Sequence, residues 1–336
     1  MKLLVCGGAG FIGSNFVRVR VRDHGDEVVV LDKLTYAGRR ENLADVEHEF
    51  VHAGIEDAAA VRGAMEGIDA VVNFAAETHV DRSISEPDAF VTTHGLGTYV
   101  LLEEARRASV RYLQVSTDEV YGSIEEGSFT ESSPLAPSSP YSATKAGADL
   151  LVGSYFHTYG METLICRGSN NYGPYQYPEK LIPLMILNAL HGDKLPVYGD
   201  GQQVRNWLYV EDFARGIGHV LEHGVPGEAY NVGGPDETYN LDVVRRIIEL
   251  TGADESLIEY VTDRPGHDRR YSLGSEKVRA LGWEAKVRFE DGLPQTVAWY
   301  QERRDWWEPI RSGDYRAYYE RQYGSALAPN TGGEDA

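Results

Sequence analysis

The sequence predicts an α/β fold, in which a doubly wound parallel sheet is followed by a smaller α+β lobe. Three observations support this prediction. Short β-rich runs alternate with helical stretches through the first half of the 336 residues. A glycine-rich turn follows the first predicted strand and opens the first helix. After Arg167 the alternation loosens, and proline and glycine gather at residues 173–178.

The first half supplies the elements of the parallel sheet. Apolar and β-branched runs predict strands at Lys2–Cys6, Glu27–Leu31, Glu49–Val51, Ala70–Phe74, Tyr112–Val115 and Thr163–Cys166. Helical periodicity lies between them, at Phe11–Asp23, Ala58–Met65, Pro87–Ala108 and Ala143–Tyr159. Strands that alternate with helices in this way predict βαβ units, with both faces of the sheet covered. We therefore expect a first domain over residues 1–168.

The second half carries helical patterns separated by short irregular segments. The predicted helices are Leu181–Leu190, Asp212–Leu221, Leu241–Leu250 and Gly292–Arg304. This pattern predicts a smaller lobe over residues 169–323, from which a segment near 205–233 returns to the large sheet. Turn-forming and acidic residues predict that 324–336 are a disordered tail.

Composition excludes several classes of protein. The 42% hydrophobic and 25% charged residues are ordinary for a globular chain, and no apolar run is long enough to span a membrane. Nothing marks export, so we expect a cytoplasmic protein. A formal net charge of −20 argues against nucleic acid or an anionic membrane as partner. The acidic, arginine-rich composition fits either a high-GC coding sequence or adaptation to high salt.

The two cysteines, Cys6 and Cys166, are far apart in the sequence and lack the spacing of metal ligands. A disulfide framework is therefore not expected, and we expect no metal site.

Gly7, Gly10 and Gly13 form a GxxGxxG pattern directly after the first predicted strand. Glycine lets the backbone turn tightly and approach a pyrophosphate at the helix N-terminus. Asp32 ends the next predicted strand, where a carboxylate can take two ribose hydroxyls and repel a 2′-phosphate. The pattern predicts a Rossmann-type domain that binds NAD, although the neighbouring Lys33 weakens the preference over NADP.

Tyr141 and Lys145 form a YxxxK pattern at the start of a predicted helix. One helical turn separates them, so the ammonium can lie under the phenol and lower its pKa. Such a phenolate can take a proton from a substrate alcohol while a hydride leaves the carbon. Together with the glycine pattern, this pair resembles the extended short-chain dehydrogenase/reductase superfamily.

Thr117, Asp118 and Glu119 follow the predicted strand that ends at Val115. In a doubly wound sheet, residues just past the carboxyl end of a strand face the ligand crevice. Adjacent carboxyl groups in unlike environments can act as acid and base, with one protonated and the other ionised. The Thr117 hydroxyl can polarise a sugar oxygen. This group of residues indicates acid–base chemistry beyond hydride transfer.

Several longer segments resemble those of dTDP-glucose 4,6-dehydratases. They are TDEVYG at 117–122, PYSATKAGAD at 140–149, NNYGPYQYPEKLIP at 170–183, YGDGQQVRNWLYVEDFARG at 198–216 and DRPGHDRRY at 263–271. The similarity runs from Met1 to about Trp307. It implies a hydro-lyase of nucleotide-sugar metabolism that binds NAD and a dTDP-sugar. It also implies a homodimer that pairs through helices near 91–108 and 143–159.

The resemblance implies a role for each matching position. The implied catalytic residues are Thr117, Asp118, Glu119, Tyr141 and Lys145. The implied NAD-binding residues are Gly7, Gly10, Phe11, Ile12, Gly13, Asp32, Lys33, Thr35, Ile55, Ala75, Ala76, Thr78, Thr93, Tyr141, Lys145 and Asn171. The implied nucleotide-sugar residues are His79, Thr117, Asn170, Lys180, Leu181, Pro196, Tyr198, Arg205, Asn240, Arg264 and His267.

These residues suggest an order of steps. Tyr141 takes the proton of the sugar 4-hydroxyl, which Thr117 positions, while C4 gives a hydride to NAD⁺. The new ketone acidifies the C5 proton, which Glu119 removes, and protonated Asp118 donates to the departing 6-hydroxyl. The hydride then returns to C6 and a proton reaches C5, giving the 4-keto-6-deoxy sugar with the cofactor regenerated.

Three positions depart from this family. Gly54 stands where the family has an Asp that hydrogen-bonds the adenine amino group, which predicts altered NAD affinity. His94 replaces an Asn beneath the active site, and Cys6 replaces a Thr and is expected to be a small buried thiol.

Two other functions remain as alternatives. A nucleotide-sugar 4-epimerase or decarboxylase would share the cofactor domain and the YxxxK pattern, but has no use for the adjacent Asp118 and Glu119. A non-catalytic nucleotide-sugar binder would explain the departures at Gly54 and His94. The spacing of the residues leaves open whether the nucleotide is dTDP or UDP.

Overall fold

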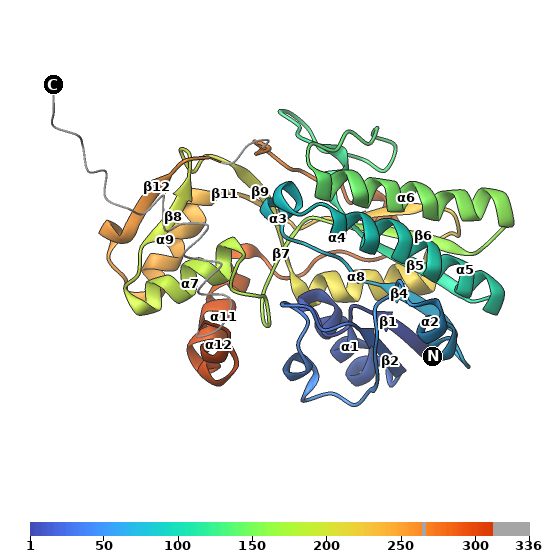
Figure 1. Cartoon of the computed structure of the whole chain (residues 1–336). Helices are drawn as coiled ribbons and strands as arrows, with labels where there is room; N and C mark the ends of the chain where they lie inside the picture. Colours follow the sequence, from blue (N-terminus) through green and yellow to red (C-terminus); the bar gives the residue numbers. More distant parts are fainter. Residues whose placement is uncertain (264–266, 312–336) are drawn as a thin grey trace, which may run out of the picture.

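The computed structural model describes residues 1–263 and 267–311. Its central element is a sheet of seven parallel strands. Figure 1 shows this sheet between layers of helices. The strand order is β10-β6-β5-β4-β1-β2-β3. Because the chain moves outward from β1 in both directions, its connections cover both faces, and the predicted doubly wound sheet is confirmed. The strands are β1 (Lys2–Cys6), β2 (Glu27–Asp32), β3 (Glu49–His52), β4 (Ala70–Asn73), β5 (Arg111–Thr117), β6 (Thr163–Gly168) and β10 (Ala229–Val232).

Each central strand is buried on both faces, which explains its continuous apolar sequence. In β1, Leu3 and Val5 belong to one hydrophobic core, whereas Leu4 and Cys6 belong to the core on the opposite face. The helices α1 (Phe11–His24) and α8 (Val210–His223) cover the first face. The second face is covered by α2 (Ala58–Ala64), α5 (Thr98–Ala108) and α6 (Pro140–Tyr159).

The segment expected near 205–233 divides between the two sheets. Its first part is β9 (Val204–Tyr209), which pairs with β7 (Asn170–Tyr172) and β11 (Asp236–Tyr239) in a separate three-stranded sheet. Its second part contains α8, which packs beside α1, and β10, which pairs with β6 in the large sheet. The domain boundary between 168 and 169 stays a prediction.

The predicted helix at 87–108 is interrupted in the structure. A short helix α4 (Asp88–Phe90) is followed by a π-helical stretch η2 (Val91–Gly97), and only then by α5. A Cβ built on Gly97 would lie 2.5 Å from the side chain of Ile55, so a larger residue here would have to displace that side chain. The wider turn directs Thr93 and His94 into the interior.

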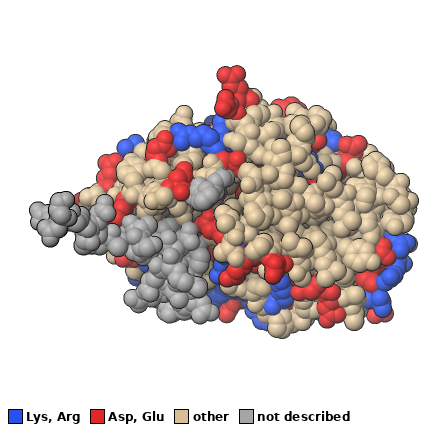
Figure 2. Space-filling model, turned by 45° about the horizontal axis from the view of Figure 1, so that its top comes forward, with Lys and Arg blue, Asp and Glu red and all other residues tan. Residues whose placement is uncertain are grey.

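The outer surface of α5 and α6 is poor in charge. Figure 2 shows a broad area with few Lys, Arg, Asp or Glu side chains on this side of the molecule. Six large apolar side chains of α3 (Val80–Ser85), η2, α5 and α6 are about half exposed or more: Ile84, Val91, Leu96, Tyr99, Leu150 and Tyr159. Among the described residues, none of the helices combines the length and apolar character needed to cross a bilayer.

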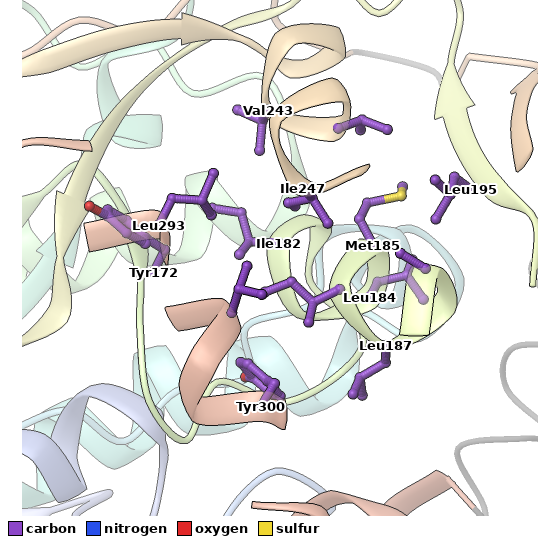
Figure 3. Close-up of a cluster of buried hydrophobic side chains, with 14 of the residues drawn as sticks. Tyr172, Ile182, Leu184, Met185, Leu187, Leu195, Val243, Ile247, Leu293 and Tyr300 are labelled. Atoms are coloured by element: carbon purple, nitrogen blue, oxygen red, sulfur yellow. The ribbon is translucent and has the colours of Figure 1, made fainter. Parts of the chain in front are cut away.

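The lobe has a separate hydrophobic core, built around α7 (Leu181–His191). Figure 3 shows Ile182 and Met185 of α7 directed toward Ile247 of α9 (Asn240–Thr251), with Leu293 and Tyr300 of α11 (Phe289–Glu302) close by. A parallel pair of strands, β8 (Leu195–Tyr198) and β12 (Ile258–Val261), closes one side. The remaining elements are η1 (Arg40–Leu43), η3 (Asp118–Tyr121), η4 (Glu255–Leu257), α10 (Glu276–Ala280) and α12 (Arg304–Arg311).

A buried hydrogen-bonded chain ties the lobe to the first glycine loop. Asn42, which is 1% exposed, donates from Nδ2 to the carbonyl oxygen of Ala9 at 2.8 Å. Its Oδ1 accepts a hydrogen bond from the indole nitrogen of Trp306 in α12, also at 2.8 Å. The Asn42 side chain therefore connects the end of the described chain to its beginning.

Replacing Asn42 by Ala should destabilise the fold measurably. The substitution leaves the indole N–H of Trp306 and the carbonyl of Ala9 buried without these partners, at a cost of about 2 to 4 kcal/mol. Equilibrium urea unfolding measures the change, with the neighbouring exposed Glu41→Ala as control. Equal unfolding midpoints for N42A and E41A would show that this chain of hydrogen bonds contributes nothing.

Candidate active site

A cavity lies at the carboxyl ends of the sheet strands, where the sheet meets the lobe. Its walls come from the loops after β1, β2, β3, β4 and β5, and from the segment 168–180 that leads into α7. All the residues that we expected to bind NAD line this cavity, and so do all five expected catalytic residues. The placement follows from the parallel sheet, because the carboxyl ends of its strands open at one edge.

The first glycine loop forms a close-packed cradle. Gly7 has a φ of +74°, and a Cβ on it would lie 2.5 Å from the backbone nitrogen of Ala75. A Cβ on Gly13 would lie 2.4 Å from the carbonyl oxygen of Gly7. No side chain caps the N-terminus of α1, which begins after Gly10. Its free N–H groups and the small loop therefore fit a pyrophosphate group.

Asp32 lies beside this loop and helps to hold it. Its Oδ2 accepts a hydrogen bond from the backbone of Ala9 at 3.0 Å, and its Oδ1 accepts one from Leu34 at 2.8 Å. Burial raises the pKa of Asp32, and these two hydrogen bonds oppose that effect. The ammonium of Lys33 contacts Oγ1 of Thr93 at 3.2 Å and pairs with Glu77 at 3.4 Å.

Asp118 is a buried carboxyl group placed directly after β5. Only 2% of the residue is exposed. Burial, and then the neighbouring Glu119 carboxylate, raise the pKa of Asp118 to about 7. The hydroxyl of Thr117 donates to its Oδ1 at 3.2 Å, which partly opposes the rise. Glu119 is only half-buried, so the two adjacent carboxyl groups differ in burial, and Asp118 can carry a proton near neutral pH.

The pKa of Tyr141 differs from our expectation. We expected Lys145 to lower it, but burial and the Glu119 carboxylate raise it, and a hydrogen bond with Thr117 opposes them only partly. The ammonium of Lys145 donates to the carbonyl oxygen of Val115 at 2.7 Å. Burial lowers the pKa of Lys145 to about 8. The YxxxK spacing brings both side chains to the cavity, but it does not determine that the Lys145 ammonium hydrogen-bonds to the carbonyl of Val115.

His94 packs beneath Tyr141 and is buried in a neutral form. Its ring centre lies 5.9 Å from that of Tyr141 in an edge-to-face arrangement, and 5.8 Å from that of Phe90. Its Nδ1 lies 2.8 Å from Oγ1 of Thr144. Burial and the nearby Lys145 hold the pKa of His94 well below its usual range. The imidazole thus joins η2 to the first turn of α6 without adding charge.

Three of the expected nucleotide-sugar residues line the cavity. They are Thr117, Asn170 and Lys180. The side-chain oxygens of Asn170 and of the adjacent Asn171 are both buried, and neither makes a hydrogen bond within the described part of the chain. Lys180 donates to the carbonyl oxygen of Thr78 at 2.6 Å, which brings the lobe against the loop after β4.

The other described residues of this set lie outside the cavity lining: His79, Leu181, Pro196, Tyr198, Arg205, Asn240 and His267. Within this set, Tyr198 and His267 pack edge to face, and Nδ1 of His267 lies 2.6 Å from the Asp263 carboxylate. Arg205 is only 5% exposed, and its guanidinium lies over the ring of Tyr271. Arg264 and the predicted tail at 324–336 lie outside the described residues.

Several residues of the cavity wall were not predicted from the sequence. Tyr36 donates a hydrogen bond to the buried carboxylate of Glu179 at 2.8 Å, and both residues line the cavity. Glu179 belongs to the segment 170–183, which resembles the family closely, but the resemblance implied no role for Glu179 itself. Glu56 also lines the cavity, next to Gly54. The glycine at that position was the only signal that could have directed attention to it.

Comparison with known proteins identifies the family. The family model for GDP-mannose 4,6 dehydratase matches residues 4–296. The dTDP-glucose 4,6-dehydratase of Streptomyces niveus is 50% identical over 94% of this chain and 97% of its own. The low-salt glycan biosynthesis protein Agl12 of Haloferax volcanii is 53% identical over 89% of this chain and 98% of its own.

Solved structures agree with this assignment. DesIV, a dTDP-glucose 4,6-dehydratase from Streptomyces venezuelae determined with NAD and TYD bound, superposes with a TM-score of 0.90. It is 52% identical, and the match covers 92% of this chain and 100% of that one. The chain therefore belongs to the dTDP-glucose 4,6-dehydratase family of the extended short-chain dehydrogenases/reductases.

Proposed function

We propose that this chain catalyses the NAD-dependent dehydration of dTDP-glucose to dTDP-4-keto-6-deoxyglucose. The observation that carries the proposal is Asp118, a buried carboxyl group with a pKa raised to about 7. It adjoins Glu119 at the end of β5, in the same cavity as Tyr141 and the glycine cradle. A 4-epimerase needs a base and a hydride acceptor, but it needs no second acid for a departing hydroxyl group. Family membership and the dTDP-glucose activity of similar proteins support the same reaction.

The residues present fit NAD as the cofactor. The cradle of Gly7 and Gly13 would hold the pyrophosphate, and Asp32 would lie at the adenosine ribose. When bound, NAD supplies hydride transfer, from C4 of the sugar at the start and to C6 at the end. The assignment of Asn171, Thr93 and the other lining residues to the cofactor remains part of this proposal.

The residues after β5 and at the start of α6 would then move the protons. Burial and Glu119 raise the pKa of Tyr141, so its phenolate has to be favoured by the positive charges of bound NAD⁺ and of Lys145, one helical turn away. In that form Tyr141 accepts the proton of the 4-hydroxyl. Thr117 holds the 4-oxygen. Glu119 removes the proton from C5, and Asp118 donates its proton to the 6-hydroxyl, which leaves as water. Glu119 then returns a proton to C5 as C6 receives the hydride. The raised pKa of Asp118 keeps that proton available near neutral pH.

Mass spectrometry of the products tests the reaction and the choice of nucleotide. The purified chain is incubated with dTDP-glucose and, separately, with UDP-glucose, without added NAD. We expect the dTDP-sugar to lose one water, because a tightly held cofactor is regenerated in each turnover. An unchanged mass with inverted stereochemistry at C4 would replace the dehydratase by an epimerase. Faster turnover of UDP-glucose would reassign the nucleotide.

Replacing Asp118 by Asn should stop elimination while C4 oxidation continues. The amide cannot donate a proton as an acid, so dehydration should fall roughly 100- to 10,000-fold. The near-ultraviolet absorbance of reduced nicotinamide should then build up in proportion to the enzyme. The exposed Asp291→Asn controls for the loss of one negative charge. Full product formation by D118N would remove Asp118 from the reaction.

The pH profile should show the titration of the same group. Because the pKa of Asp118 is raised to about 7, its acid form is present below that pH and is lost above it. The dehydration rate should therefore fall as the pH rises through about 7. Lys145, with a pKa lowered to about 8, should add a second fall at higher pH. Stopped-flow measurements of the dehydration rate should show both falls, near pH 7 and near pH 8. The D118N variant should lack the fall near pH 7. A rate that does not change with pH contradicts the assignment.

We further propose that two copies pair through the outer surface of η2, α5 and α6. In the first half of α6 the exposed positions Ala143, Gly147 and Leu150 recur at helical spacing and carry small or apolar side chains, and Leu96 and Tyr99 are exposed on η2 and α5. Leu150, at 67%, and Leu96, at 51%, are the most exposed leucines of this surface. The chain carries a net charge of −20, so a surface with so few charged side chains stands out from the rest. Exposed apolar patches of this kind mark sites of protein–protein contact. A cytoplasmic location stays a prediction.

Replacing Leu96 and Leu150 by Glu should break this pairing. Four added carboxylates per dimer would be buried together, which the fold cannot compensate. Multi-angle light scattering after gel filtration should give the mass of one chain for the double variant and of two for the wild type. The exposed Val225→Glu serves as the control, since it lies outside this surface. A dimer that survives L96E/L150E excludes this surface as the interface.

A further inference from the structure

The end of the cavity beyond Asp32 is formed by the turn that follows β3. The lining residues there are Ala53, Gly54, Ile55 and Glu56. In a Rossmann-type sheet the pyrophosphate lies at α1 and the ribose lies at the end of β2, so the nucleotide base lies beyond, next to the end of β3. This turn is therefore where the base of the dinucleotide would be recognised, an assignment that rests on the proposed function.

The conformation of this turn is fixed on both sides. The backbone nitrogen of Asp57 donates to the carbonyl oxygen of Gly54 at 3.1 Å, which closes the turn. Ile55 is 2% exposed and packs closely against Gly97 of η2. The carboxylate of Asp57 caps α2, accepting a hydrogen bond from the nitrogen of Ala59 at 3.0 Å. Asp57 is thus occupied as a helix cap, and Gly54 has no side chain to offer.

The carboxylate of Glu56 fills the space above Gly54. A Cβ built on Gly54 would lie 2.4 Å from each of the two carboxylate oxygens of Glu56. Oε2 of Glu56 is buried and accepts no hydrogen bond from any described residue. A buried acceptor without a partner is costly, and the cost is recovered when a ligand supplies the donor. Glu56 lines the cavity, where such a donor would come from the bound base.

We propose that Glu56 recognises the adenine of the dinucleotide by accepting a hydrogen bond from its exocyclic amino group. The amino group is the only strong donor on the exposed edge of adenine. Glu56 thereby replaces a side chain at position 54, from two residues further along the turn. The absence of a carboxylate at Gly54 consequently costs the chain little of its preference for adenine.

A competition between two dinucleotides tests this role without reference to turnover. The holoprotein is equilibrated with mixtures of NAD and nicotinamide hypoxanthine dinucleotide, in which a carbonyl oxygen replaces the amino group. After desalting, the nucleotides that remain bound are quantified by chromatography. We expect the wild type to prefer NAD about tenfold, the worth of one charge-assisted hydrogen bond. The exposed Glu66→Ala, which removes the same charge, should keep that preference.

The variants at the turn should change the preference in opposite ways. Glu56→Ala should bind both dinucleotides about equally. The amide of Glu56→Gln can donate to the carbonyl oxygen of hypoxanthine, so this variant should lose the preference for NAD or reverse it. Moving the carboxylate back in Gly54→Asp/Glu56→Ala should restore the preference for NAD. An unchanged preference in E56A overturns the inference. A wild type that retains neither dinucleotide overturns the proposed function itself, and the inference with it.

Discussion

The loop between β1 and α1 is the constraint on which the rest of the structure depends. Its backbone passes so close to Ala75 that only glycine fits at position 7. The carboxylate of Asp32 fixes the loop from the side of β2, through the N–H of Ala9. Asn42 fixes it from the other side, through the carbonyl of the same residue, and in turn binds Trp306 of the lobe. One short loop therefore sets the cofactor cradle and the position of the lobe together.

Burial shifts the pKa values of Asp118, directly after β5, and of Lys145, in α6, in opposite directions. It raises the pKa of Asp118 and so keeps a proton on an acid near neutral pH. It lowers the pKa of Lys145, which leaves that amine close to losing its proton. The contrast arises because exclusion of water disfavours whichever form of a group is charged. One cavity can therefore provide both a proton donor, Asp118, and a weakly stabilised cation, Lys145.

Much of the fold and the cavity could be predicted from local patterns. Continuous apolar runs identify strands that are buried on both faces, and the glycine spacing and the Thr117–Glu119 segment mark the edge where those strands end. Features that depend on contacts between distant segments could not be predicted. The π-helical stretch η2 ends at Gly97, which packs against the distant Ile55. Lys145 donates a hydrogen bond to the carbonyl of Val115, a contact that its spacing from Tyr141 does not reveal. The position of the Glu56 carboxylate likewise depends on how one turn folds over Gly54.

The central claim is that one cavity oxidises C4, eliminates water between C5 and C6, and returns the same hydride to C6. The most direct measurement uses dTDP-glucose that carries deuterium at C4, followed by NMR of the product. The account predicts a 4-keto-6-deoxy sugar with the deuterium at C6, because the hydride never leaves the cavity. Deuterium restored at C4, in a sugar that has kept its 6-hydroxyl, would contradict it.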